Sequence, residues 1–368
     1  MNKEIHKNRI EKLVKILKEH VVSGYISGLS DNLYYFSNYY GIQYERFFAL
    51  VVTTDGEAIL VVPKLEKDQV RNTTWIENIV TWADGEDPFE KIYSIFKEKK
   101  LLNSKIAVDN TLRSDFLLAL QEKLPQVCFI VGSNFSNILR RVKSAEEKNL
   151  MMNVGSIQDK VYDKVIASIN AGISEMYIAD LILSTFKELG SKCSSPLPIV
   201  ASGQFSAQPH YRATNKIISI GDSIVMDCGG DLDHYKSDMT RTVFVGKPSK
   251  EFLTIYDIVR KAQETAFKSV KPGRTCEEID QVARDIIEKE GYGKYFIHRT
   301  GHGIGLESHE EPYIVKGNKL ILEPGMTFSI EPGIYLPGKF GVRIEDCVIV
   351  TETGAEAFTH FTHDLITI

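Results

Sequence analysis

Four acidic residues lie inside stretches of the sequence that otherwise have the composition of buried β-strands. Asp227 occurs in IVMDC and Asp238 in KSDMTRTVFV, whereas Glu331 occurs in FSIEP and Glu345 in VRIEDCVIV. A single acid in such a strand is commonly a rim residue or pairs with a nearby Lys or Arg. If all four converge, each close pair of ionised carboxylates costs about 4 kcal/mol at an effective dielectric constant of about 20. A shared and partly buried carboxylate site therefore requires cations.

The four acids occur in two halves of the chain that share one order of elements. Each half has two segments with apolar residues at helical spacing, followed by two β-rich runs joined by a turn. The helical segments are residues 140–170, 174–190, 251–270 and 276–290, and the β-rich segments are residues 223–245 and 326–351. Ser144 and Glu147 have the spacing of a capping box in the first helix. This repeat predicts a pseudo-symmetric α+β domain over residues 139–368, in which helices cover one side of an antiparallel sheet.

Residues 1–138 alternate between strand and helix signals instead. The expected strands are residues 21–29, 47–62 with a turn at Asp55-Gly56, 79–83, 105–110 and 127–132, and the expected helices include residues 1–20 and 87–100. This alternation predicts an α/β domain with a mixed sheet and helices on its faces. The domain contains neither GxGxxG after a strand nor GxxxxGK, so a nucleotide site lacks support. Its expected role is that of a scaffold, a cover or an oligomer interface.

Length and charge limit the remaining classes of protein. At 368 residues the chain suits two domains, because single cores rarely grow beyond about 250–300 residues. The net charge of −5 and the lack of a basic block argue against nucleic acid as the main partner. No apolar run approaches the ~18 residues of a membrane span, and the charged N-terminal helix has no signal-peptide core, so a cytoplasmic protein is expected. The five cysteines form no CxxC pair, which predicts reduced thiols rather than disulfides or a thiolate zinc site.

Residues 298–309, HRTGHGIGLESH, contain three of the nine histidines of the chain. Histidine is the side chain most often used as a metal ligand or as an acid and base near neutral pH. Four carboxylates would balance two divalent cations, and one imidazole would add a single nitrogen to an oxygen-rich ligand set. Such a set suits Mn²⁺ better than a structural zinc. Two-metal sites lower the pKa of a shared water and make hydroxide available at neutral pH, so the expected chemistry is hydrolysis.

Six motifs follow one another along the chain, namely PHY at residues 209–211, MDCGG, SDMTRT, HRTGHGIGLESHE, EPGMTFSIEPGIY and GVRIED. In order and spacing they resemble the pita-bread metallopeptidases of family M24, in the proline-specific branch of Xaa-Pro dipeptidases (prolidases) and Xaa-Pro aminopeptidases (aminopeptidase P). The resemblance is dense over residues 140–368. It is looser before them, where DNLYYFSNYYG and the strand alternation are similar to a creatinase-type N-terminal domain. The cysteine of MDCGG replaces a commoner aromatic residue, which leaves metal chelation intact and affects the local packing.

The resemblance implies a dinuclear metal site with five protein ligands. Asp227 would chelate one metal with both oxygens, and Asp238 and Glu345 would bridge the two ions. His302 and Glu331 would complete the other ion. Mn²⁺ is the expected metal, with Co²⁺ and Zn²⁺ as alternatives.

The resemblance also implies roles in binding and catalysis. His309 and His210 would flank the scissile carbonyl and stabilise the oxyanion, and Glu331 would carry the proton to the proline nitrogen. His298 would line the pocket that receives proline, and His210 and Arg343 would also contact the substrate. Arg343 would lie beside the site as a cation, on the same strand face as the acid two residues after it.

For the other histidines a surface or structural role is expected. They are His6, His20, His360 and His363 at the surface and His234 in a turn. Arg299 has two open interpretations, an ion pair with an acid or a contact with a substrate carboxylate. Gly301, Gly303 and Gly305 are expected to let the loop pack closely.

A dedicated site is needed for the proline-specific reaction, because a Xaa-Pro bond is a tertiary amide without an N–H and its ring restricts the backbone. The leading hypothesis is a Xaa-Pro dipeptidase, since the chain has no additional domain or long insertion. The close alternative is a Xaa-Pro aminopeptidase acting on longer peptides, and the remote alternative is a non-catalytic pita-bread binding protein. A methionine aminopeptidase is disfavoured by the N-terminal domain, and a creatinase by the complete ligand set.

The N-terminal domain contains a dense aromatic segment. Residues 30–48 include five tyrosines and three phenylalanines, a composition that suits either a plain core or an aromatic interface. In the family that the chain resembles, this domain commonly contacts its counterpart in a homodimer. We therefore expect a homodimer in which part of residues 30–48 lies near the catalytic mouth and acts as a lid.

Overall fold

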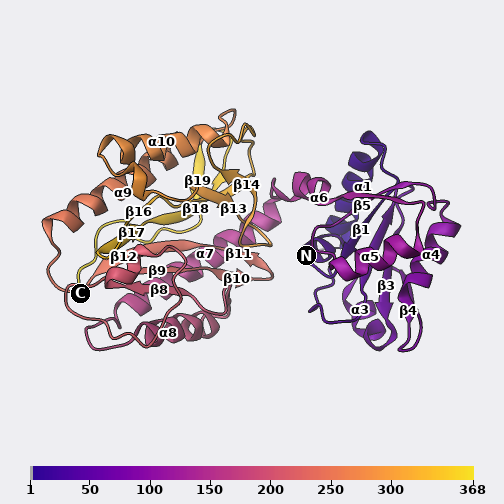
Figure 1. Ribbon diagram of the computed structural model, residues 1–368, viewed down its shortest axis with the longest axis horizontal. Helices are drawn as coiled ribbons and strands as arrows, with labels where there is room; N and C mark the ends of the chain where they lie inside the picture. Colours follow the sequence, from indigo (N-terminus) through magenta and orange to yellow (C-terminus); the bar gives the residue numbers. More distant parts are fainter. Residues whose placement is uncertain (1–2) are drawn as a thin grey trace. The chain divides into compact units, whose positions relative to one another are not determined.

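Helices and strands alternate through the first of the two units into which the chain divides. The computed structural model describes residues 3–368, and the units are Met1–Arg140 and Arg141–Ile368 (Figure 1). The first unit contains α1 (Lys3–Glu19), β1 (Gly24–Gly28), α2 (Asp31–Ser37), β2 (Ala49–Thr53), β3 (Ala58–Pro63), η1 (Lys64–Glu66), α3 (Lys67–Thr73), β4 (Asn78–Trp82), α4 (Pro88–Glu98), β5 (Lys105–Val108), α5 (Ser114–Lys123), β6 (Cys128–Val131) and α6 (Ser133–Arg140). The strand order is β4-β3-β2-β1-β5-β6. Because β2 is antiparallel to both neighbours and the other pairs are parallel, the predicted mixed sheet is confirmed.

One face of this sheet packs under helices α4 and α5. Ile26, Val51 and Ile106 point to this face from neighbouring strands, as the two-residue period of a strand requires. Phe96 of α4 and Leu120 of α5 close the same cluster, and neither has any exposed surface. The first unit therefore has a hydrophobic core of its own.

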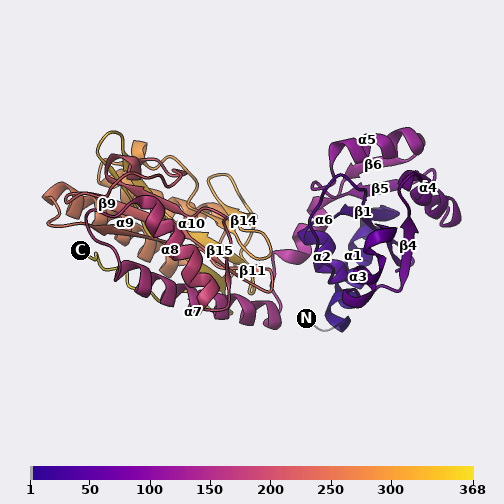
Figure 2. The same cartoon turned by 90° about the horizontal axis from the view of Figure 1, so that it is seen from below.

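The second unit is built on four long helices and one large antiparallel sheet. The helices are α7 (Ala145–Ile166), α8 (Glu175–Glu188), α9 (Lys250–Ser269) and α10 (Cys276–Lys289), and short 3-10 turns occur at η2 (Gly203–Ala207) and η3 (Gly293–Tyr295). The predicted capping box is present in α7, where Ser144 and Glu147 bond each other's backbone. Figure 2 shows α7 and α8 lying side by side.

The sheet of the second unit joins the two halves of the predicted repeat. Its strand order is β14 (Glu310–Ile314), β13 (Gly301–Gly303), β15 (Thr327–Ile330), β18 (Glu345–Val350), β12 (Met239–Phe244), β9 (Ser223–Cys228) and β8 (Ile199–Ser202), with β19 (Ala355–Ala357) beside β18. Strands β9 and β12 pair in the first half, β15 and β18 pair in the second, and β12 pairs with β18 between them. The halves thus meet at the centre of one sheet.

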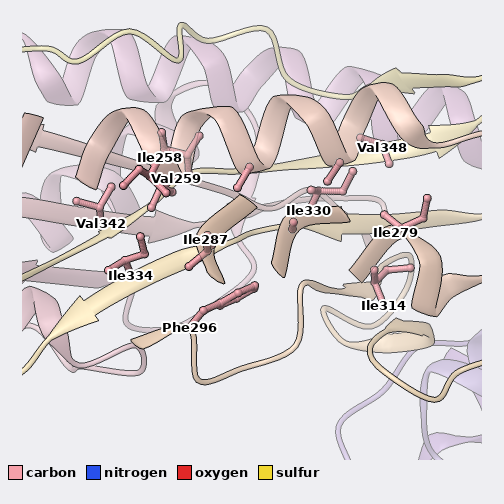
Figure 3. Packing of buried hydrophobic residues seen from close by; sticks show 14 of the residues in the cluster. Ile258, Val259, Ile279, Ile287, Phe296, Ile314, Ile330, Ile334, Val342 and Val348 are labelled. Atoms are coloured by element: carbon pink, nitrogen blue, oxygen red, sulfur yellow. The ribbon is translucent and has the colours of Figure 1, made fainter. Parts of the chain in front are cut away.

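Helices cover one face of this sheet, as predicted. Figure 3 shows Val259 of α9 and Ile279 of α10 in one cluster of buried hydrophobic residues that also contains Ile330 of β15 and Val348 of β18. A second cluster packs α7 and α8 against β8, β9 and β12, with Met226 among its strand residues. The side chains that alternate with these residues point to the opposite face, which is left free for polar groups.

Each β-rich segment contains four strands rather than the predicted two. A small hairpin of β10 (Gly230–Leu232) and β11 (Tyr235–Lys236) separates β9 from β12, and β10 also pairs with β7 (Lys192–Cys193). Another hairpin, β16 (Gly333–Leu336) and β17 (Phe340–Arg343), separates β15 from β18. Arg343 therefore ends one strand and Glu345 begins the next, so the expectation that they share a strand is wrong.

Two histidines expected at the surface are not free there. His6 is fully buried in α1, where its Nδ1 lies 2.9 Å from the carbonyl oxygen of Tyr35, and burial lowers its pKa to about 4. His363 bonds through Nε2 to the buried carboxylate of Asp346 at 2.5 Å. His20 and His360 are exposed, as predicted.

Among residues 3–368, no helix has the length and apolar character needed to cross a membrane.

Candidate metal centre

A cavity of about 700 Å³ opens on the polar side of the second unit. All of the site residues expected from the sequence line it, and they come from both halves of the repeat. They are His210, Asp227, Asp238, His298, His302, His309, Glu331, Arg343 and Glu345. Arg299 lines the same cavity. Residues separated by up to 135 positions are therefore brought to one place by the fold.

Strand register explains how the carboxylates meet. Thr240 at the start of β12 lies opposite Asp227 of β9 and opposite Glu345 of β18. Residues directly opposite one another in antiparallel strands point to the same face of a sheet. Asp238 precedes Thr240 by two residues, and Glu331 directly follows β15, which pairs with β18. The two strand pairs thus carry their acids to the middle of the polar face.

The cluster of acids is electrostatically unbalanced without cations. Burial, followed by the nearby Asp227 and Glu331, raises the pKa of Asp238 well above its usual range. Burial and the charge of Asp238 do the same to the pKa of Glu345. Ligand atoms of Asp238, His302 and Glu345 all lie within 4.8 Å of one another. A set of mutually repelling oxygens with one imidazole fits divalent cations.

Arg343 offsets part of this negative charge. It is 2% exposed, and one terminal nitrogen donates to Oδ2 of Asp227 at 2.6 Å. Its Nε donates to the hydroxyl of Thr240 at 3.0 Å, and that hydroxyl donates to Glu345 at 2.6 Å. Its other terminal nitrogen contacts the hydroxyl of Tyr335 at 2.9 Å. Every nitrogen of this guanidinium therefore has a partner, and a charge of +1 leaves most of the four carboxylates unbalanced.

His302 has the tautomer that a metal ligand requires. Its Nδ1 lies 3.0 Å from the carbonyl oxygen of Gly303, so Nδ1 carries the proton and Nε2 keeps its lone pair. This Nε2 lies 3.3 Å from Glu331. Burial lowers the pKa of His302 to about 4, so the ring is neutral at neutral pH.

Close backbone packing holds His302 in place. A Cβ on Gly301 would lie 1.8 Å from the carbonyl oxygen of Ser329, which only glycine avoids. The Ser329 hydroxyl accepts from the backbone N–H of His302 at 3.0 Å and donates to Glu331 at 3.0 Å. A Cβ on Gly305 would lie 2.6 Å from the carboxylate of Glu310. The close packing predicted for these glycines is confirmed.

His298 has both ring nitrogens occupied. Nδ1 lies 2.7 Å from the carbonyl oxygen of Arg299 and therefore carries the proton, so Nε2 accepts from the hydroxyl of Tyr335 at 2.8 Å. Burial raises the pKa of Tyr335 to about 12, which keeps that hydroxyl protonated. The same oxygen accepts from Arg343. His298 can therefore present its ring to a ligand, whereas its nitrogens are held by the protein.

His309 and His210 lie at the exposed part of the cavity lining. The rings of His309 and His302 are 4.0 Å apart between centroids. Packing around part of the His309 ring, together with repulsion from His302 and Arg299, lowers its pKa to about 4. A neutral imidazole at this position can donate an N–H to a developing negative charge.

Three residues next to the site were missed from the sequence, namely Thr240, Ser329 and Tyr335. Each bonds one of the expected site residues, as described above. All three lie within the quoted motifs SDMTRT and EPGMTFSIEPGIY, so their position was a signal. Their partners lie on other strands, however, and no local spacing predicts such contacts.

An antiparallel sheet with helices on one face and a cavity of carboxylates and imidazoles on the other defines a metal-dependent hydrolase of the pita-bread fold. Residues 149–352 match metallopeptidase family M24, and residues 9–142 match the creatinase/prolidase N-terminal domain. The chain belongs to metallopeptidase family M24. Divalent metal ions are therefore part of its chemistry.

Individual relatives agree with this assignment over nearly the whole chain. A Xaa-Pro dipeptidase of Lactobacillus helveticus is 40% identical over 337 residues, which cover 90% of this chain and 91% of that protein. The crystal structure of a recombinant prolidase from Thermococcus sibiricus superposes with a TM-score of 0.95 at 37% identity, covering 100% of both chains. An X-Pro aminopeptidase from Thermotoga maritima superposes with a TM-score of 0.86 at 30% identity, covering 98% of this chain and 99% of that one.

Proposed function

We propose that this metallopeptidase hydrolyses the bond between an N-terminal residue and proline, with Xaa-Pro dipeptides as its preferred substrates. One observation carries the proposal. Four acids and a neutral His302 converge in the cavity, and His210, His298 and His309 line it beside them. The similarity to a Xaa-Pro dipeptidase over most of both chains supports it. Residues 139–368 are proposed as the catalytic domain and residues 1–138 as the creatinase-like domain.

Five residues are proposed to hold two divalent ions. They are Asp227, Asp238, His302, Glu331 and Glu345. Four carboxylates and one imidazole favour Mn²⁺, with Co²⁺ and Zn²⁺ as the alternatives that a metal reconstitution would separate. When bound, the ions supply a water of lowered pKa and polarise the scissile carbonyl.

The remaining residues of the cavity are proposed to position the substrate and move its proton. His298, whose nitrogens are engaged by the protein, presents its ring to the proline. His309 and His210 donate to the carbonyl oxygen as it gains negative charge. Glu331 carries the proton to the proline nitrogen, which must be protonated before it can leave. Arg343 acts on this machinery by holding Asp227.

Substrate length distinguishes the dipeptidase from its alternative. The full chain would be stripped of metal, reloaded in parallel with Mn²⁺, Co²⁺ or Zn²⁺, and assayed on Ala-Pro, Ala-Pro-Ala and Ala-Ala. We expect kcat/KM on Ala-Pro to exceed that on either other peptide by about tenfold or more, a difference of about 1.4 kcal/mol in transition-state binding. Activity should be highest with Mn²⁺.

A Xaa-Pro aminopeptidase is the second candidate, because a relative that is so named shares 30% identity and nearly full coverage. Faster cleavage of Ala-Pro-Ala than of Ala-Pro would favour it. Equal cleavage of Ala-Ala and Ala-Pro would contradict proline specificity altogether.

We also propose that the protein is a cytoplasmic homodimer. The five cysteines are free thiols, which suits a reducing compartment. Most aromatic residues of the segment 30–48 are buried, but Tyr40, Ile42 and Tyr44 are 48%, 68% and 64% exposed. A second copy of the chain would cover such a patch. Light scattering of the full chain should give twice the 41.5 kDa of one copy, and a monomeric mass would contradict the dimer.

A further inference from the structure

Helix α7 carries two buried polar side chains on the face that packs against the sheet. Gln158 and Tyr162 are four residues apart and so lie on one side of the helix, and their exposed fractions are 0% and 2%. Tyr162 belongs to the same buried cluster as Met226 and Cys228 of β9. Because side chains alternate along a strand, these two point to the helix side of the sheet while Asp227 between them lines the cavity. The two polar groups therefore lie on the far side of the sheet from the candidate metal centre.

Both polar side chains bond carbonyl oxygens next to a proposed metal ligand. The hydroxyl of Tyr162 donates to the carbonyl oxygen of Met226 at 3.0 Å. The side-chain amide of Gln158 donates to the carbonyl oxygen of Cys228. Met226 and Cys228 are the residues on either side of Asp227. Helix α7 thus holds the backbone both before and after this carboxylate.

The hydroxyl of Tyr162 also reaches the neighbouring strand, β12. It lies 2.5 Å from the carbonyl oxygen of Met239, and the backbone N–H of Met239 donates to Oδ1 of Asp238 at 3.1 Å. The thiol of Cys228 lies 3.6 Å from the same hydroxyl, so a bulkier side chain at position 228 would displace the hydroxyl. A single hydroxyl therefore joins the two backbones that carry Asp227 and Asp238.

Gln158 has a feature that a purely structural residue would not need. Within residues 3–368, its Oε1 is buried and has no hydrogen-bond partner. A buried amide oxygen without a partner lowers the stability of a fold. An apolar residue of similar shape would avoid this cost, but it would leave the carbonyl of Cys228 without its donor. The amide therefore holds the backbone beside Asp227 at a cost in stability.

We infer that Gln158 and Tyr162 are positioning residues that orient Asp227 and Asp238 for metal binding. This inference rests on the proposed dinuclear site and deepens it, because it names the groups that fix the geometry of two ligands. The two carboxylates line one cavity and repel each other before the ions bind. Strands that are held in place keep them together and reduce the rearrangement that binding requires. Loss of such a partner typically weakens metal binding about 10- to 100-fold.

Titration of the metal-stripped full chain with Mn²⁺ tests the inference. Tyr162→Phe removes only the hydroxyl and should weaken Mn²⁺ binding about 10- to 100-fold. Tyr256→Phe is the matched control, because Tyr256 is a 3% exposed residue of α9 whose hydroxyl donates to the carbonyl oxygen of His363 at 3.1 Å. His363 is not a proposed ligand, so this variant should bind Mn²⁺ as the wild type does. Both variants should lower the melting temperature of the metal-free protein, since each loses a buried hydrogen bond.

A second variant, Gln158→Met, separates positioning from stability. The metal-free variant should melt at the wild-type temperature or higher, because it lacks the unpaired Oε1, and yet it should bind Mn²⁺ about 10- to 100-fold more weakly. Wild-type Mn²⁺ affinity in both Gln158→Met and Tyr162→Phe would overturn the inference alone. An equal loss of affinity in Tyr256→Phe would do the same, because it would reduce the effect to general destabilisation. A wild-type chain that binds neither Mn²⁺, Co²⁺ nor Zn²⁺ would overturn the proposed function, and this inference with it.

Discussion

Asp238→Asn is expected to remove both metal ions together and to lower kcat/KM by about 10³-fold or more, since loss of metal chemistry removes several kcal/mol of transition-state stabilisation. Asp238 is partly buried, and both Asp227 and Glu331 are close enough to raise its pKa, so it lies at the centre of the cluster. An amide of the same shape carries no charge and donates where the carboxylate accepts. Metal analysis after dialysis, together with activity on Ala-Pro, checks the prediction.

The metal-free protein provides a second measurement for the same variant. An acid whose folded pKa is raised destabilises the fold when it is ionised, which is its state at neutral pH in the unfolded chain. With a chelator present, the variant should therefore melt at the same temperature as the wild type or higher. Asp233→Asn, on an exposed turn, is the control and should retain metal and activity. Two ions at full occupancy in the Asp238 variant would contradict the bridging role.

His309→Ala is expected to retain both ions and yet lose about 10²- to 10³-fold in kcat, the effect of removing one donor to a developing oxyanion. The ring lies on the exposed side of His302, and its low pKa makes it a neutral donor at neutral pH. Because the proposed partner is the reacting carbonyl, KM should change much less than kcat. Steady-state kinetics on Ala-Pro and metal analysis of the same preparation measure both quantities.

The control for this prediction is His360→Ala, which removes an exposed imidazole outside the cavity and should leave kcat unchanged. Loss of a metal ion from the His309 variant would make His309 a ligand instead of a donor. Wild-type kcat with both ions present would show that the residue has no part in the reaction.

Local patterns were sufficient to predict most helices and strands. The capping box of Ser144 and Glu147, the period of α9 and the turn at Asp55-Gly56 between β2 and β3 depend on residues close in sequence, and each is present in the structure. The acids of the cavity were also identifiable, because a charge in an apolar strand is costly unless it has a partner. These features are decided by backbone propensity and burial, which act over a few residues.

Contacts between distant strands were decided only by the tertiary structure. The sequence predicted that Arg343 and Glu345 share one strand, whereas Arg343 ends β17 of a hairpin inserted between β15 and β18, and Glu345 begins β18. The buried His6 and the chain of hydrogen bonds through Tyr335 depend on elements that meet only after folding. The lack of an ion-pair partner for Arg299 within residues 3–368 also depends on how distant strands meet. An ion pair depends on which acids the strand register brings within about 4 Å, and that distance is set by the packing of the whole domain.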